Sequence, residues 1–160
     1  MNSFPASLRA AALAVLALAV PIGPATGPHG LRAAELETLV VEKAAGDNVS
    51  FDVEMALTPE QRARGLMYRD RLEPMSGMLF IYPGPQEVNM WMQATRIPLD
   101  MLFIAPDGTI LKIRERAVPF SKEVIGSGGP VVAVLEVNGG TASRYGIQPG
   151  DRVLLPGVLP

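Results

Sequence analysis

Two carboxylates interrupt apolar segments of the sequence, where charged side chains are unusual. Asp100 stands within Leu-Asp-Met-Leu-Phe, and Glu136 stands within Val-Leu-Glu-Val. Ionised carboxylates are seldom buried without a partner. One interpretation is that arginines or backbone amides at a strand end hold each acid separately. The other is that the two acids share a cleft as general acid and general base, with burial separating their pKa values.

Arginines are the obvious counter-ions for these acids. Five of them cluster in the segment before Asp100: Arg62, Arg64, Arg69, Arg71 and Arg96. Structural ion pairing is the simplest interpretation of such a cluster. The alternative is a pocket for an anionic ligand, because guanidinium groups bind carboxylates and phosphates with two parallel hydrogen bonds.

Methionines are the second unusual feature. The tripeptide Met90-Trp91-Met92 would place two thioethers on one face of a strand. Thioethers bind Cu(I), which makes Met90 and Met92 candidate metal ligands. Core packing explains them more simply, because methionine fills irregular gaps. Trp91 would face the opposite side, either as part of the core or as a platform for a sugar ring.

The N-terminal segment has the organisation of a secretory leader. Arg9 is followed by an unbroken apolar run from Ala10 to Val20 and then by small residues. This order predicts a signal peptide over residues 1–34, cleaved between positions 25 and 34, and therefore a periplasmic or secreted mature chain. An uncleaved N-terminal anchor is the alternative, although the apolar run is shorter than the roughly 20 residues that span a bilayer.

Loss of the leader restricts the chemistry of the mature chain. The sequence has no cysteine, and its single histidine, His29, lies in the segment expected to be removed. Thiolate and imidazole nucleophiles are then excluded, as are zinc sites built on those groups. No disulfide and no cofactor are expected.

Removal of the leader also makes the chain more acidic. Arg9 and Arg32 are its only charged residues, so the formal net charge changes from −2 to about −4. Such a balance favours neither a nucleic-acid partner nor an anionic membrane surface. Stable membrane insertion of the mature chain is not expected either.

Residues 35–160 have the length of one ordinary domain. Apolar and polar residues alternate from Val49 to Leu57, which predicts a half-buried strand, and Leu36 to Lys43 predicts its hairpin partner. The Thr-Pro-Glu-Gln sequence at 58–61 is typical of a capping box, with proline at the first helical position. It predicts a short helix that ends at Gly65.

Most of the remaining chain is expected to be β. Strands are predicted at residues 77–82, 88–92, 99–104, 109–118, 131–137 and 151–155. A Pro-Asp-Gly turn joins the third and fourth of these strands. The apolar strand 131–137 should be buried on both faces. Residues 126–130 are expected to be a glycine-rich connection, and residues 139–145 a short helical turn. The predicted fold is mainly β (α+β), a compact antiparallel-rich barrel or sandwich with one or two short helices.

Five short motifs occur in the order in which a known family has them. They are Gly65-Leu66-Met67-Tyr68-Arg69, Gly77-Met78-Leu79-Phe80, Trp91-Met92-x-x-Thr95-x-Ile97-Pro98-Leu99-Asp100, Leu135-Glu136-x-x-Gly139-Gly140, and Gly146-Ile147-x-x-Gly150-Asp151. Together they closely resemble the family catalogued as domain of unknown function 192, over about Leu39 to Leu155. The resemblance implies a compact β-rich fold with short helices and implies no activity. Gln93 and Ala94 depart from the polar, Lys-Asn-like pair that the family usually has there.

These motifs define a candidate site. Its ligand-binding set is Arg64, Arg69, Thr95, Arg96, Asp100, Glu136 and Trp91, beside an apolar frame of Met67, Met78, Phe80 and Met92. The favoured function is a non-catalytic periplasmic binding module for a small polar or anionic ligand or an envelope carbohydrate. One alternative is a carboxylate-dependent hydrolase of envelope polymers, with Asp100 and Glu136 as acid and base. Another is an accessory or scaffold protein of the cell envelope; fold class alone does not decide among the three.

Overall fold

A curled seven-stranded sheet is the largest structural element of the chain in the computed structural model, which describes residues 36–154 and residue 157. The strand order is β6-β5-β8-β3-β2-β1-β9. The strands of this sheet are β1 (Leu36–Glu42), β2 (Val49–Ala56), β3 (Ser76–Gln86), β5 (Leu99–Ile104), β6 (Ile110–Ala117), β8 (Val131–Asn138) and β9 (Arg152–Leu154). The expected signal peptide, residues 1–34, lies outside the described residues.

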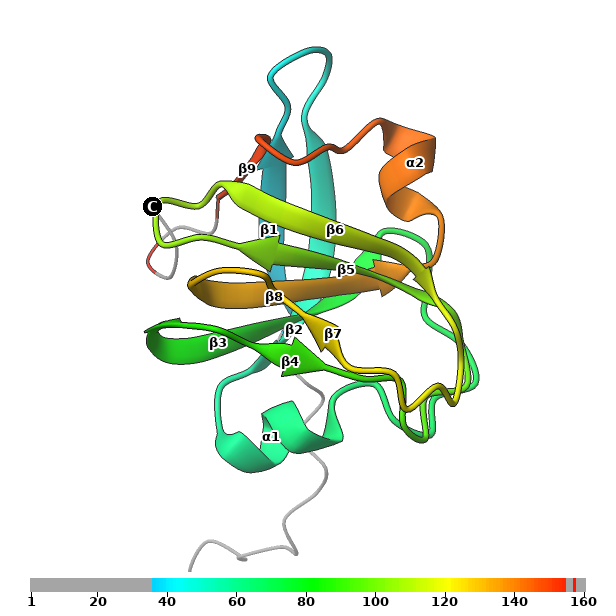
Figure 1. Ribbon diagram of the computed structural model, residues 1–160. Coiled ribbons are helices and arrows are strands. Elements are labelled where there is room, and N and C mark those ends of the chain that lie inside the picture. Colours follow the sequence, from blue (N-terminus) through cyan, green and yellow to red (C-terminus); the bar gives the residue numbers. More distant parts are fainter. Residues whose placement is uncertain (1–35, 155–156, 158–160) are drawn as a thin grey trace, which may run out of the picture. The chain divides into compact units, whose positions relative to one another are not determined.

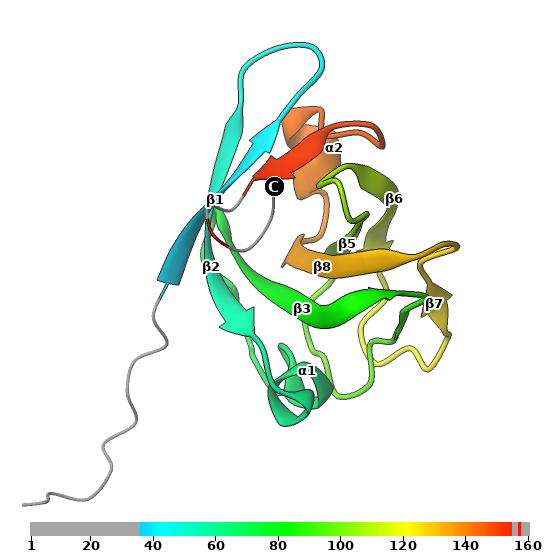
Figure 2. The ribbon, with the colours of Figure 1, turned by 90° about the vertical axis from the view of Figure 1, so that its left-hand side faces the viewer.

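Neighbouring strands of the sheet pair antiparallel except β2 and β3, which run parallel. Helix α1 (Pro59–Arg64) lies in the connection between them, as a parallel pair requires a crossover. The sheet curls so strongly that β1 and β2 run across the direction of β5 and β8 (Figures 1 and 2). The predicted mainly β fold is confirmed, in the form of a half-barrel with two short helices.

Helix α1 begins where the sequence predicts it because its N-terminus is capped from both sides. The Gln61 backbone N–H donates to Thr58 Oγ1 (3.2 Å), and the Thr58 N–H donates to Gln61 Oε1 (2.9 Å). Gly65 ends the helix with φ 47° and ψ −136°. A Cβ at Gly65 would lie 3.0 Å from Phe80 Cζ, so glycine allows the end of α1 to approach β3 closely.

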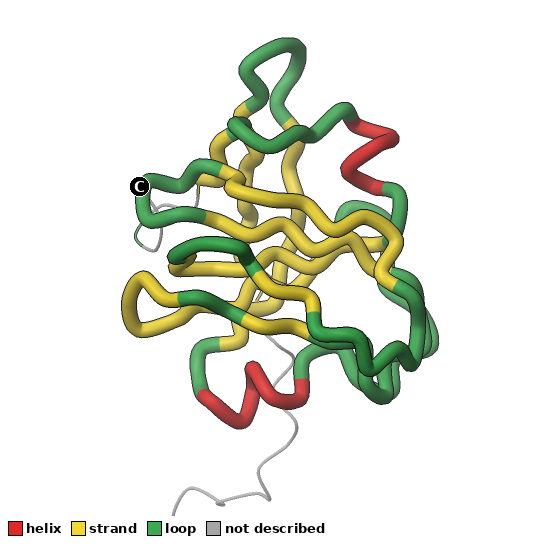
Figure 3. The backbone as a smooth tube through the Cα atoms, viewed as in Figure 1, coloured by secondary structure: helices red, strands yellow, loops and turns green. Residues whose placement is uncertain are grey.

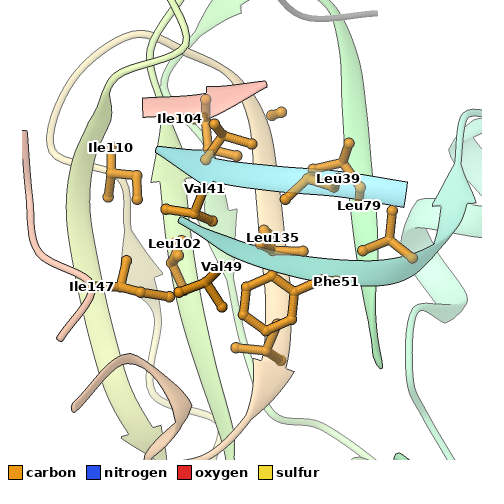
Figure 4. Packing of buried hydrophobic residues seen from close by; sticks show 14 of the residues in the cluster. Leu39, Val41, Val49, Phe51, Leu79, Leu102, Ile104, Ile110, Leu135 and Ile147 are labelled. Carbon is orange, nitrogen blue, oxygen red and sulfur yellow. The ribbon is translucent and has the colours of Figure 1, made fainter. Parts of the chain in front are cut away.

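The two faces of the sheet carry separate hydrophobic clusters. One cluster includes Phe51, Leu102 and Leu135 and is shown in part in Figure 4. The other includes Phe80 and Val134 and lies on the opposite face of the same strands. Successive side chains of a strand point to opposite faces, so β8 contributes to both clusters. Its predicted burial on both faces is confirmed.

The strand predicted over residues 88–92 is wrong beyond Met90. Only β4 (Asn89–Met90) forms, and it pairs with β7 (Ile125–Gly126) in a second, two-stranded sheet. The chain then turns, because the Met92 N–H donates to Ser121 O and the Thr95 N–H donates to Met92 O, both at 3.1 Å. Figure 3 shows this region as strands that give way to long loops.

The second helix, α2 (Thr141–Tyr145), follows β8 and occupies the predicted helical turn. Both helices are short. Among the residues that the structure describes, no helix is long and apolar enough to cross a membrane.

Candidate ligand-binding site

Glu136 lies on β8, an inner strand of the sheet, in the middle of an apolar face. The residues directly opposite Glu136 in the adjacent strands are Met78 on β3 and Met101 on β5. Glu136 is 4 % exposed. Within residues 36–154 its carboxyl group has no hydrogen-bond or ion-pair partner. In this part of the chain, every side-chain polar atom that the protein encloses completely has a hydrogen-bond partner. Because the Glu136 oxygens have none, they are not completely enclosed and open into a pocket. Burial raises the pKa of Glu136 to about 8, because the charged form loses its hydration.

A pocket of about 210 Å³ lies over Glu136. One wall is α1 with the segment that follows it, a second is the end of β3, and a third runs from β4 to Thr95. The lining residues are Arg62, Ala63, Arg64, Gly65, Leu66, Met67, Phe80, Tyr82, Asn89, Met90, Trp91, Thr95 and Glu136. Most of this wall is apolar, and it contains two guanidinium groups and one buried carboxyl group.

Two aromatic side chains shape the pocket. Tyr82 follows Phe80 on the same face of β3, and its hydroxyl group donates to Met90 Sδ (3.6 Å). Burial raises the pKa of Tyr82 to about 12; the Arg62 charge lowers the pKa and the Glu136 charge raises it further. Trp91 is 48 % exposed and therefore lies at the pocket as an accessible platform rather than in the core.

The arginines of the predicted cluster have different environments. Arg62 donates to Ile81 O (2.9 Å), and its guanidinium carbon lies 5.2 Å from the centroid of the Tyr82 ring. Arg69 forms two hydrogen bonds with Glu54, at 2.5 and 2.6 Å.

The two outlying arginines of the cluster are engaged on the surface. Arg71 pairs with Glu73 at 3.1 Å, and Arg96 pairs with Asp70 at 2.6 Å. Arg64 is exposed and has no such partner among the described residues. It lines the Glu136 pocket and also an adjoining pocket of about 330 Å³ that contains the Arg69–Glu54 pair.

Residues 40–155 match the sequence profile of DUF192, a family described as an uncharacterized ACR. The chain belongs to the DUF192 family. The predicted resemblance is thus confirmed, and it covers nearly all of the described residues.

Two solved structures are similar to this DUF192 chain. One, a "putative transcription regulator" from Sinorhizobium meliloti 1021, is 47 % identical and has a TM-score of 0.77, covering 80 % of this chain and 99 % of its own. The other, a protein of unknown function from Novosphingobium aromaticivorans DSM 12444, is 37 % identical with a TM-score of 0.74, covering 80 % of this chain and 91 % of its own. Among proteins with curated descriptions, none matches.

In this DUF192 chain, Asp100 lies on the face of the sheet opposite to that of Glu136. It is opposite Val137 in the β5–β8 register, whereas Glu136 is opposite Met101. Its carboxylate accepts three backbone N–H groups at 2.8 Å, from Arg116, Gly140 and Ala142. Asp100 therefore holds the start of α2 against β5 and β6 and does not share a cleft with Glu136.

The structure brings together part of the predicted ligand-binding set. Arg64, Trp91, Thr95 and Glu136 line one pocket. Thr95 is 5 % exposed, and its backbone C=O accepts the Phe120 N–H, which ties two loops together. The other members of the set, Arg69, Arg96 and Asp100, lie outside this pocket because each is engaged with another group.

Sequence reasoning missed Tyr82 as part of the site. The available signal was its spacing from Phe80, since residues two apart on a strand share a face. Arg62 was recognised only as one member of a charged cluster, and its place at the pocket depends on the position of α1 over β3.

The two candidate Cu(I) ligands are not assembled as a pair. Met90 lines the pocket, whereas Met92 is fully buried in the second hydrophobic cluster. The predicted arrangement required a continuous strand through both residues, and the strand ends at Met90. In the described part of the chain, no group of three His, Asp or Glu side chains could hold a metal ion.

Proposed function

We propose that this chain is an exported binding module that holds a small polar ligand in the Glu136 pocket and does not catalyse a reaction. The observation that carries the proposal is a buried carboxyl group that has no partner among the described residues and opens into a pocket. Burial deprives this carboxyl group of most of its hydration. A ligand that forms a hydrogen bond with it in the pocket replaces part of that lost hydration.

The shape and chemistry of the wall support the same role. Trp91 and Tyr82 offer aromatic surface against which a sugar ring or another flat ligand can pack. A pocket of about 210 Å³ is smaller than the roughly 300–1,000 Å³ of drug-sized ligand sites, so the ligand is expected to be a single small unit.

Hydrolysis by a pair of carboxylates is the less favoured function. That chemistry places two acids on either side of one bond, within roughly 10 Å of each other. Asp100 points to the opposite face of the sheet and is occupied by three backbone N–H groups. Glu136 is then left as a single acid in the pocket.

Regulation of transcription, which the description of the Sinorhizobium meliloti protein suggests, is not part of this proposal. The chain has 14 basic and 16 acidic residues, and proteins that bind nucleic acid usually carry a basic surface. A DNA-retention assay with random duplex at low salt is expected to show no binding.

Export is proposed from the sequence of residues 1–34. The full-length chain should be recovered from the periplasm or medium with a new N-terminus between positions 25 and 35, as determined by N-terminal sequencing. An intact N-terminus in the cytoplasmic or membrane fraction would contradict the proposal.

Binding is tested by thermal shift and calorimetry of residues 35–160 against monosaccharides, amino acids and organic acids. At least one class should raise the melting temperature of the wild-type protein, and Trp91→Ala should abolish that rise. Phe120→Ala is the matched control, because Phe120 is an exposed aromatic residue outside the pocket. The proposal fails if no compound stabilises the protein, or if the two variants lose stabilisation equally.

A further inference from the structure

We infer that the ligand of the Glu136 pocket is a small organic anion, held by Arg64 at its charged group and by a hydrogen bond from Glu136 to an acceptor oxygen elsewhere on the ligand. This inference rests on the binding role proposed above and names the chemical class of the ligand. It follows from which of the charged groups around the pocket already have partners among the described residues and which do not.

Arg64 is the guanidinium group that is available to a ligand. Arg62, the other arginine in the pocket wall, donates to the backbone carbonyl groups of Leu57 and Ile81 and stacks over Tyr82. In the adjoining pocket Arg69 is neutralised by Glu54. Arg64 borders both pockets, and its guanidinium group has no partner within residues 36–154. Such a group is well suited to bind a carboxylate.

Glu136 does not supply the negative charge that would balance these arginines. The elements packed around it contribute Arg62 and Arg64 from α1 and Tyr82 from β3. Its cross-strand residues on β3 and β5 are methionines, and the lining residues from Asn89 to Thr95 do not titrate. Burial alone raises the pKa of Glu136 to about 8. At neutral pH the group is therefore an uncharged hydrogen-bond donor, and the pocket is electropositive.

An electropositive pocket disfavours the opposite class of ligand. An ammonium group beside Glu136 would require the carboxyl group to lose its proton, which weakens binding about tenfold at pH 7 when the pKa is about 8. Two guanidinium groups would also repel the cation. An anion meets neither obstacle.

The wall indicates what separates the two polar ends of the ligand. Met67, Phe80 and Tyr82 line the pocket together with Arg64 and Glu136. The ligand is thus expected to have an apolar body with a carboxylate and a carbonyl or hydroxyl oxygen, as in small keto acids and hydroxy acids.

The first test compares matched probes by calorimetry at pH 6.5. Pyruvate, 4-oxopentanoate and phenylpyruvate are each titrated beside an alcohol and an amine of the same carbon skeleton. At least one acid should bind, and its amine and alcohol counterparts should bind at least about tenfold more weakly. If an amine or a neutral sugar binds best and Trp91→Ala abolishes that binding, the anion is excluded while the binding role stands. If no compound tested here or above binds, both proposals fail.

The second test examines the two polar contacts with the acid that binds best. Arg64→Ala should weaken binding at least about tenfold, and Arg71→Ala, which removes a surface arginine outside the pocket, should not. Equal effects of the two variants would show that Arg64 acts only through general charge and would overturn the assignment.

The pH dependence identifies the role of Glu136. Above pH 8 wild-type affinity should fall about tenfold per pH unit, since ionisation removes the donor and adds a repelling charge. Glu136→Leu should weaken binding at pH 6.5. Glu136→Gln, whose amide is a neutral donor, should restore most of the affinity and remove the fall above pH 8. Affinity that rises with pH, or a glutamine variant as weak as the leucine variant, would show that Glu136 binds as an anion. Melting temperatures confirm that each variant is folded.

Discussion

Asp100 and Glu136 are both buried, on opposite faces of one sheet, and the groups that surround them differ completely. Asp100 is 0 % exposed and accepts three backbone N–H groups at 2.8 Å. Glu136 is 4 % exposed and has no partner among the described residues. The first carboxylate belongs to the scaffold. The second opens into a pocket and is available to a ligand.

The difference shows that burial of an acid does not by itself indicate a functional site. A carboxylate that receives several backbone N–H groups is stabilised in its charged form and fixes local structure. A carboxyl group that receives none tends to keep its proton and weakens the fold. Asp151 supports this distinction, because it is 5 % exposed and accepts the N–H groups of Ala44 and Gln148 at 3.0 and 2.8 Å.

The largest expected effect is the loss of the Asp100 carboxylate. Asp100→Ala should lower the free energy of unfolding by roughly 5 kcal/mol, because three buried or partly buried backbone N–H groups lose their acceptor. Urea denaturation measures the change. Asp107→Ala is the matched control, since that exposed side chain accepts a single backbone N–H, from Thr109, and the substitution should cost less than about 1 kcal/mol. Equal losses would contradict the structural role of Asp100.

Much of the scaffold could be predicted from the sequence because its signals are local. The alternation in β2, the capping box at Thr58 and the Pro-Asp-Gly turn each specify a strand, a helix start or a hairpin within a few residues. The parallel pairing of β2 with β3 could not be predicted in this way, because it depends on how the α1 crossover packs on the sheet.

The site was only partly predictable for the same physical reason. The sequence identified Asp100 and Glu136 as unusual, but one position separates the two faces of a strand, and the β5–β8 register decides which acid faces which cluster. Likewise, five arginines in one segment look alike until their partners are known. Arg64 becomes distinct only because Arg69 and Arg96 are paired with acids from other parts of the chain.

The next effect is the pH dependence of stability, which should come from Glu136. Below pH 4.5 the group is protonated in both the folded and the unfolded chain; between pH 4.5 and about 8 the unfolded chain loses the proton and the folded chain keeps it. Stability should therefore fall by about 4 kcal/mol from pH 4.5 to pH 8 and then level off. Comparing urea denaturation of wild type and Glu136→Gln across this range isolates the contribution. A parallel pH course in the two proteins would show that the carboxyl group is not protonated in the folded state.

A smaller effect of the opposite sign to that of Asp100→Ala is expected when Glu136 is made apolar. Glu136→Met, which continues the row of Met78 and Met101, should raise the free energy of unfolding by about 2 kcal/mol at pH 4, where Glu136 is protonated in both the folded and the unfolded chain, and should abolish ligand binding. Glu115→Met on the exposed side of β6 is the control and should change stability by less than about 0.5 kcal/mol. Destabilisation by Glu136→Met would mean that the carboxyl group has a stabilising partner in the folded protein.

The smallest effect concerns the backbone on the two sides of the molecule. Gly140 and Gly146, which flank α2 near Asp100, adopt φ of 88° and 65°, whereas Ala94 at the pocket loop adopts φ of 56°. A side chain is strained in this left-handed region. Ala94→Gly should therefore raise the free energy of unfolding by about 0.5–1 kcal/mol, while Ala63→Gly in the exposed face of α1 should lower it by about 1 kcal/mol.

Two outcomes of this pair of substitutions, measured by urea denaturation, separate local strain from a general effect of glycine. Opposite signs at Ala94 and Ala63 would place the strain in the loop that carries Trp91 and Thr95, next to the pocket. A loss of stability at both positions would show that Ala94 is not strained, because glycine then acts only by increasing the freedom of the unfolded chain. If the strain is present, relieving it should also weaken ligand binding slightly, since the Ala94 carbonyl accepts the Tyr68 N–H (2.9 Å) and helps to hold the loop in place.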